Sequence, residues 1–249
     1  MRTVGVIILY TLNMLYIVPT PLGNLQDITL RALEVLKSAD IILCEDTRRT
    51  QILLSHFALN KPTQRYNEND PRSLERCVQL LKAGKTAALV SDCGTPCISD
   101  PGWRLVRRAV EEGIAVSSLP GPSAVACALA GAGITGGAFS FLGFLPRKPG
   151  KAAKLISQAH ALGVPVVLYE SPYRVIKMLG LIAKTLGEDT PMVVARELSK
   201  VHEEWLRGSV KHVADTLAAR SKVQGEFVLI IDRPCTLEKE EEDESNPYF

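Results

Sequence analysis

Residues 86–102, which read TAALVSDCGTPCISDPG, constrain the fold of this chain more than any other stretch. The apolar segment at 87–90 predicts a short buried strand. The strand runs into a polar loop, and Pro101 then suggests the start of a helix. Strand, polar loop and helix in this order predict a ligand-binding edge in an α/β protein, because open sheets bind ligands beyond the carboxyl ends of their strands.

The same alternation of strand and helix recurs along the chain and predicts an α/β fold. A glycine-rich passage at 131–136 separates two runs of it. The pattern therefore predicts two α/β domains, at 14–133 and 138–233, with the ligand cleft between them. The predicted strands are 15–18, 41–44, 87–90, 114–119, 139–144, 164–169, 191–195, 203–207 (an edge strand) and 226–231. The predicted helices are 27–37, 47–57, 71–83, 101–112, 124–130, 152–161, 173–186 and 209–220.

The two ends of the chain are expected to lie outside these domains. Residues 1–13 are interpreted as an N-terminal extension, since Met14 stands directly before the first predicted strand. Residues 234–249 carry an acidic run without apolar periodicity, which predicts a disordered tail. Nothing approaches the roughly 20 apolar residues that cross a bilayer, so no membrane partner is expected.

Composition sets limits on partners and location. The net charge of +2 does not demand nucleic acid, so any RNA contact must come from local basic clusters. The six cysteines are scattered and do not form a disulfide framework, which favours a reducing, cytoplasmic setting. The four histidines are far apart in sequence, so no metal site is expected.

Several polar residues have a structural interpretation beside the functional one. Asp70, Asp100 and Ser171 each precede a proline, which is typical of a helix N-cap with proline at the first helical position. Asp92 follows a strand where no helix begins, so a ligand contact is favoured over a turn-stabilising role. Charged residues near predicted strand ends, such as Glu170 with Arg174, fit surface ion pairs and cleft-facing groups equally well.

Eight stretches, taken together and in order, resemble a known family. They are LYIVPTPLGNLQDITLRAL, EDTRRT, ALVSDCGTPCISDPG, LPGPSA, GFLPRK, YESPYR, VVARELSK and GEFVLII, and they are spread across nearly the whole range of residues 14–232. The chain resembles the ribosomal RNA small subunit methyltransferase I family, within the tetrapyrrole methylase superfamily. Cys93 and Cys97 stand where that family usually has small residues.

The resemblance implies an activity, a cofactor and partners. It implies 2'-O-methylation of a cytidine in the decoding region of 16S rRNA, in the 30S subunit, with S-adenosylmethionine as donor and no metal. It also implies a homodimer. A tetrapyrrole-type small-molecule methylase and a non-catalytic RNA- or donor-binding module stay open as alternatives.

The resemblance also implies roles for individual residues. The donor pocket is expected to contain Leu22, Asp92, Thr95, Pro96, Ile98, Ser123, Ala124, Tyr169 and Phe227. Candidates for the group that takes the proton of the ribose hydroxyl are Asp46, Asp100, Glu170 and Glu197, which spacing alone does not rank. The residues expected to hold RNA phosphates are Arg48, Arg49, Arg147, Lys148 and Arg174.

Overall fold

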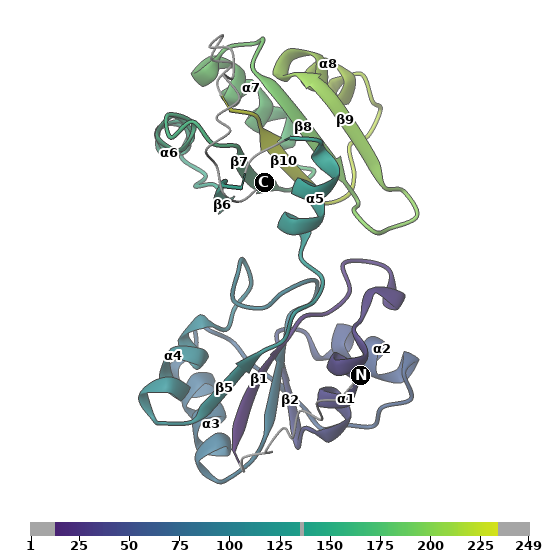
Figure 1. Ribbon diagram of the computed structural model, residues 1–249, viewed down its shortest axis with the longest axis vertical. Coiled ribbons are helices and arrows are strands. Elements are labelled where there is room, and N and C mark those ends of the chain that lie inside the picture. Colours follow the sequence, from purple (N-terminus) through teal and green to yellow (C-terminus); the bar gives the residue numbers. More distant parts are fainter. Residues whose placement is uncertain (1–12, 135–136, 234–249) are drawn as a thin grey trace, which may run out of the picture. The chain divides into compact units, whose positions relative to one another are not determined.

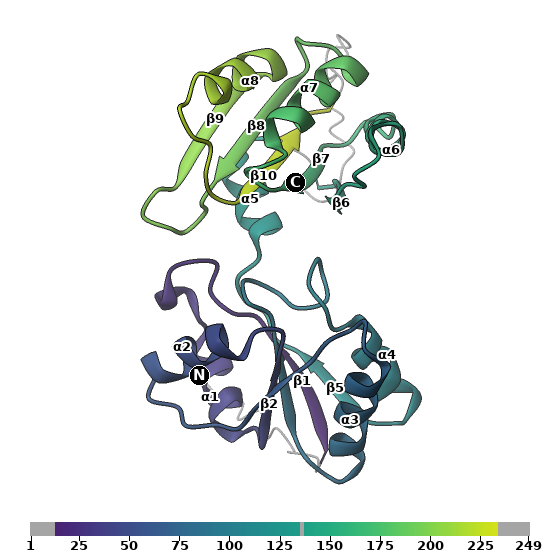
Figure 2. The ribbon, with the colours of Figure 1, turned by 180° about the vertical axis from the view of Figure 1, so that it is seen from behind.

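The computed structural model describes residues 13–134 and 137–233, which form two compact units (Figures 1 and 2). The first comprises the described residues up to Gly131 together with Ala195–Glu204, and the second comprises the remainder. Each unit contains helices and a five-stranded sheet, which confirms the α/β class and the two-domain layout. The predicted tail and all but Asn13 of the predicted extension lie outside the described residues.

The first unit is built on a parallel sheet. Its strands are β1 (Met14–Val18), β2 (Ile41–Cys44), β3 (Thr63–Arg65), β4 (Ala87–Val90) and β5 (Ala115–Ser118), in the order β3-β2-β4-β1-β5. All four neighbouring pairs are parallel, so every strand ends at the same edge. The strand β3 is absent from the predicted elements.

Helices cover both faces of this sheet because its strands are apolar on both sides. They are α1 (Leu30–Ser38), α2 (Thr47–His56), α3 (Pro71–Lys82) and α4 (Trp103–Glu111), and a short 3-10 helix, η1 (Leu25–Asp27), precedes α1. Successive side chains of β1 point to opposite faces: Val18 packs in one core with α1 and α2, and Ile17 in another with α3 and α4. Figures 1 and 2 show these helix pairs on opposite sides of the sheet.

The neighbouring strands β1 and β4 form a topological switch point. The chain leaves β1 toward α1 on one face, and it leaves β4 toward α4 on the other. Open α/β sheets bind ligands outside the carboxyl ends of their strands at such a point. The polar loop that follows β4 therefore lies where a ligand is expected.

The second unit holds a mixed sheet. Its strands are β6 (Ser140–Phe144), β7 (Val166–Glu170), β8 (Pro191–Arg196), β9 (Glu204–Ser209) and β10 (Phe227–Ile231) in the order β6-β7-β10-β8-β9, so the predicted edge strand is confirmed at β9. Strand β10 runs antiparallel to β7. The helices α6 (Pro149–His160), α7 (Val175–Leu186) and α8 (Val210–Ala218) share one apolar core with this sheet, and α5 (Ala124–Ala132) precedes β6. Over residues 13–134 and 137–233, every helix is too short or too polar to span a bilayer.

Of the three predicted N-caps, one is confirmed and two are wrong. Asp70 caps α3, and its side chain accepts from the Arg72 amide at 3.0 Å. Ser171 does not cap α7, which begins at Val175. A turn comes first, because the amides of Arg174 and Val175 both donate to the Ser171 carbonyl, at 3.1 and 3.0 Å.

Asp100 is likewise not the N-cap of α4. This helix begins at Trp103, and the cap position is Gly102, with φ of +143° and no side-chain cap bond. The Glu68 carboxylate accepts the Gly102 amide instead. A contact from a distant segment thus sets the start of the helix, two residues after the position that Pro101 suggests.

We expect Gly102→Ala to lower the stability of the first unit by roughly 2–4 kcal/mol, since it adds a steric clash to an unfavourable φ. An added Cβ would lie 2.6 Å from Cys97 Sγ and 2.6 Å from Leu89 Cδ2. The matched control is Gly84→Ala, where φ is +85° and nothing lies within 4 Å, so only about 1 kcal/mol is expected. Urea unfolding followed by Trp103 fluorescence in a Trp205→Phe background measures both, and equal losses would contradict the packing argument.

Candidate functional site

The loops after β1 and β4 are locked together at the carboxyl edge of the first sheet. Thr20 and Gly94 exchange two backbone hydrogen bonds, of 2.9 and 3.0 Å. The Thr20 hydroxyl donates to the Ser91 carbonyl at 3.0 Å, and the Ser91 hydroxyl donates to the Gly94 carbonyl at 2.8 Å. Both hydroxyl groups belong to buried residues, so their bonds are shielded from competing water. The two loops therefore hold one conformation.

The loop after β5 joins this arrangement through the same segment. The Thr95 hydroxyl donates to the Pro122 carbonyl at 2.8 Å, and the Cys93 thiol donates to the Leu22 carbonyl at 3.1 Å. Gly94 is required between them: its φ is +81°, and a Cβ there would lie 3.2 Å from Leu22 Cδ2. The predicted donor residues Leu22, Thr95 and Ser123 are thus brought to a single edge by interlocking loops.

Cys97, one of the two cysteines in the β4 loop, lies in surroundings that disfavour reactivity. Burial raises the pKa of the Cys97 thiol to about 11, and the carboxylates of Glu68 and Asp100 add to the effect. Cys97 also has φ of +69° and borders the space that a Cβ at Gly102 would fill. A protonated, half-buried thiol is a poor nucleophile, so these surroundings favour packing over chemistry for Cys97.

Asp92 is the residue of this edge with an unmet hydrogen-bonding capacity. Its Oδ1 is buried and has no hydrogen-bond partner among the described residues. Its Oδ2 lies 3.6 Å from Arg49 Nε, and the side chain as a whole is 24% exposed. A buried carboxylate oxygen without a donor costs free energy, so Asp92 is poised to accept a hydrogen bond from a ligand.

The remaining predicted donor residues fall into two groups. Pro96 is buried and Ile98 is exposed in the β4 loop, and Ala124 begins α5. Tyr169 and Phe227 lie in the second unit, on the neighbouring strands β7 and β10. Phe227 belongs to the apolar core there, whereas the half-buried Tyr169 ring makes an edge contact with Phe141 at 4.9 Å between centroids.

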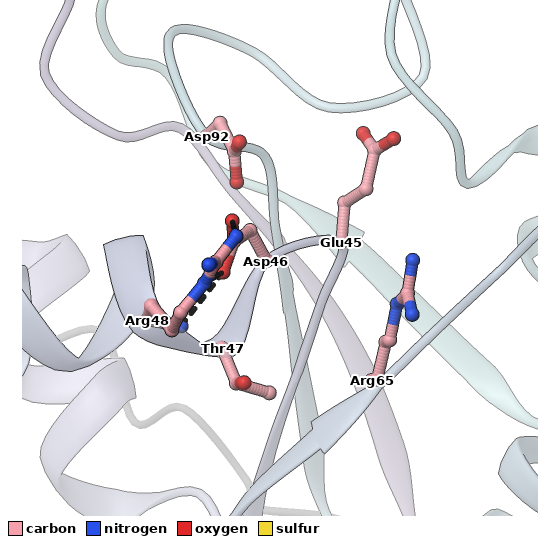
Figure 3. A pocket seen from close by; sticks show the side chains of 6 residues that line it. All are labelled: Glu45, Asp46, Thr47, Arg48, Arg65 and Asp92. Carbon is pink, nitrogen blue, oxygen red and sulfur yellow. Dashed lines mark hydrogen bonds and ion pairs between the residues drawn. The ribbon is translucent and has the colours of Figure 1, made fainter.

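A pocket of about 360 Å³ opens at the ends of β2, β3 and β4 (Figure 3). It is lined by Glu45, Asp46, Thr47, Arg48, Arg65 and Asp92. Asp46 caps α2 through the Arg48 amide at 2.9 Å, and it also accepts from Arg48 Nε and Nη2 at 3.1 and 2.8 Å. These bonds hold the pKa of the Asp46 carboxyl well below its usual range, which makes Asp46 a weak base.

Arg65 is a pocket residue that the sequence did not reveal. It is the last residue of β3, whose three residues are too few to give a periodic signal. The β-branched Thr63 was a local hint of a strand there. Register pairs Arg65 with Cys44, the last residue of β2, and both Arg65 and Glu45 line the pocket.

Glu170 is a buried carboxylate at the end of β7 in the second unit. Its Oε1 accepts from the Ser171 amide at 2.7 Å. Its Oε2 lies 3.3 Å from Arg174 Nη2, an ion pair whose geometry is not that of a hydrogen bond. Arg174 Nη2 donates to the Leu145 carbonyl at 3.1 Å. Oε2 therefore keeps a lone pair for a further donor.

The other predicted residues are more dispersed. Glu197 has φ of +54° and accepts from Lys200 Nζ at 2.9 Å, and Asp100 is partly buried in the β4 loop. Arg147 and Lys148 are exposed directly before α6. Among the residues that the structure describes, no three His, Cys, Asp or Glu side chains gather as a metal site requires.

Comparison with known proteins agrees with the resemblance seen in the sequence. The family model of tetrapyrrole (corrin/porphyrin) methylases matches residues 14–214. A protein of Hydrogenobaculum sp. named "Ribosomal RNA small subunit methyltransferase I" is 42% identical over 91% of this chain and 98% of its own length. The protein of the same name from Thermotoga maritima is 42% identical over 87% of this chain and 97% of its own length.

Solved structures of tetrapyrrole methylases share the fold at low identity. Cobalt precorrin-4 methyltransferase superposes with a TM-score of 0.65 at 20% identity, over 87% of this chain and 94% of that one. Uroporphyrin-III C-methyl transferase from Thermus thermophilus, complexed with S-adenyl homocysteine, gives 0.63 at 15% identity, over 87% and 96%. The chain belongs to the tetrapyrrole methylase family, and within it to the family of the ribosomal RNA small subunit methyltransferase I proteins.

Proposed function

We propose that this protein is an S-adenosylmethionine-dependent methyltransferase of ribosomal RNA, and that it methylates the 2'-hydroxyl of a cytidine in the decoding region of 16S rRNA. The observation that carries the proposal is the name shared by relatives 42% identical over nearly their whole length. The cytidine and the 2'-oxygen come from the family resemblance. A 30S subunit is the proposed partner, and the proposed acting form is a homodimer.

The edge of the first sheet suits the methyl donor chemically. The donor carries ribose hydroxyls and an ammonium group, and Asp92 Oδ1 is a buried acceptor without a partner among the described residues. The buried Leu22 offers an apolar contact at the same edge. Residues proposed to hold the donor are those predicted from the sequence. When bound, the donor supplies an electrophilic methyl group.

The protein's own part in the reaction is positioning and proton removal. A ribose hydroxyl is a weak nucleophile. Alignment of its oxygen with the methyl carbon at about 3–3.5 Å, together with exclusion of water, therefore accounts for much of the expected rate enhancement. Of the four candidate bases, Asp46 is disfavoured by its lowered pKa. Glu170 is favoured, because Oε2 makes no hydrogen bond with a described residue. Arg48, Arg49, Arg147, Lys148 and Arg174 are proposed to hold RNA phosphates.

Transfer of labelled methyl to 30S subunits that lack the modification is the direct test. We expect label in 16S rRNA, and nuclease digestion is expected to release a 2'-O-methylated cytidine. Label in a free tetrapyrrole offered in parallel would instead support a small-molecule methylase. Donor or RNA binding without transfer to either substrate would point to a non-catalytic binding module, and both of these results would overturn the proposal.

We expect Asp92→Asn to weaken binding of S-adenosylhomocysteine by roughly 10-fold or more, since a hydrogen bond to a charged group contributes about 1.5–3 kcal/mol. Isothermal titration calorimetry measures the change. The control is Asp70→Asn, because asparagine caps a helix about as well as aspartate and Asp70 lies at α3. Equal affinity in the Asp92 variant and the wild type would remove Asp92 from the donor pocket.

We expect Glu170→Gln to lower kcat by about 100-fold with little change in donor affinity, because a positioned base contributes roughly 10²–10⁴-fold. Single-turnover transfer to 30S subunits measures the rate, and Glu34→Gln on the exposed side of α1 serves as control. A Glu170 variant that is folded, binds donor and reacts at the wild-type rate would exclude Glu170 as the base.

A further inference from the structure

The pocket in Figure 3 contains two charged side chains that have no assigned role and no partner among the described residues. Asp46 and Arg48 are bonded to each other, and Asp92 faces Arg49. Glu45 and Arg65 make neither a hydrogen bond through their side chains nor an ion pair within residues 13–134 and 137–233. One acceptor and one donor group are therefore available to a ligand in this pocket.

The two groups line the same pocket, at the ends of the neighbouring strands β2 and β3. Cys44 pairs with Arg65 across β2 and β3, so Glu45 is the next residue beyond that pair. Neighbouring strands lie about 4.8 Å apart, so residues that line one pocket at their ends can contact the same small ligand. Figure 3 draws both side chains reaching out from the strand ends, and no dashed line joins either to another residue.

We propose that Glu45 and Arg65 recognise the Watson–Crick edge of the target cytosine. Cytosine presents an exocyclic amine, which the Glu45 carboxylate accepts, beside the acceptors N3 and O2, to which the Arg65 guanidinium donates. Uracil places a carbonyl oxygen where cytosine has the amine, and a carboxylate repels it. This inference rests on the proposed function and adds the residues that choose the base.

The composition of the pocket favours a base over a phosphate. Asp46 is paired with Arg48 and Asp92 with Arg49, so Glu45 and Arg65 remain as one acceptor and one donor, which a base with both kinds of group matches better than a phosphate does. A volume of about 360 Å³ falls in the range of small-molecule sites, roughly 300–1,000 Å³. Asp92 is shared with the proposed donor pocket, so a nucleotide bound here would be held next to the donor.

The test compares subunits reconstituted with 16S rRNA that carries cytidine or uridine at the mapped target position. We expect the wild type to prefer cytidine in kcat/KM. In Glu45→Gln the side-chain amide can accept or donate, so the preference for cytidine is expected to fall about 10-fold or more. Arg65→Gln is expected to lower kcat/KM for cytidine by a similar factor. Glu34→Gln is the matched control on α1 and should keep the wild-type preference.

Two further measurements keep the outcomes separate. S-adenosylhomocysteine titration establishes that each variant is folded and binds donor, and competition binding of the two RNAs, with S-adenosylhomocysteine present, measures base preference without turnover. An unchanged preference in Glu45→Gln and an unchanged kcat/KM in Arg65→Gln would overturn the inference while the proposed function stands. A wild type that methylates neither RNA would overturn the proposed function itself.

Discussion

The backbone pairing of Thr20 with Gly94 is the interaction on which the candidate site depends. It ties the ends of β1 and β4 together at the point where their connections depart toward opposite faces of the sheet. The buried hydroxyls of Thr20 and Ser91 complete the pairing, so polar backbone groups in these loops are satisfied without water. Because the loops are fixed in this way, Asp92 can keep a buried oxygen without a partner among the described residues.

Regular elements followed from the sequence wherever apolar periodicity was long enough to be read. The α/β class, the two-domain layout and the Asp70 cap were all predicted correctly. The start of α4 was not, because it depends on the Glu68 carboxylate, which arrives from another part of the chain. The start of α7 was also missed, since the Ser171 carbonyl closes a turn first. Rules based on local sequence fail where other hydrogen bonds satisfy the backbone groups at the start of a helix.

The candidate site was likewise predictable from the sequence only in part. Asp92 could be singled out because it follows a strand that no helix immediately succeeds. The double role of Asp46, as cap and as partner of Arg48, could not be read from spacing, and neither could the presence of Arg65 in the same pocket. The place of Arg65 depends on how β2 and β3 are placed in register. Sequence thus reveals which residues stand at strand ends, and structure reveals which of those ends are neighbours.

The assignment of Ala195–Glu204 to the first unit has a consequence for synthesis of the chain. The Ser199 hydroxyl bonds to the Asp27 carboxylate, and Lys200 packs against Gly23, where a Cβ would collide with it. Gly23 and Asp27 are thus translated early, and their partners Lys200 and Ser199 are translated much later. The strands β1 to β5 are all translated before this segment, whereas the loop after β1 acquires these contacts only after most of the second unit has been translated.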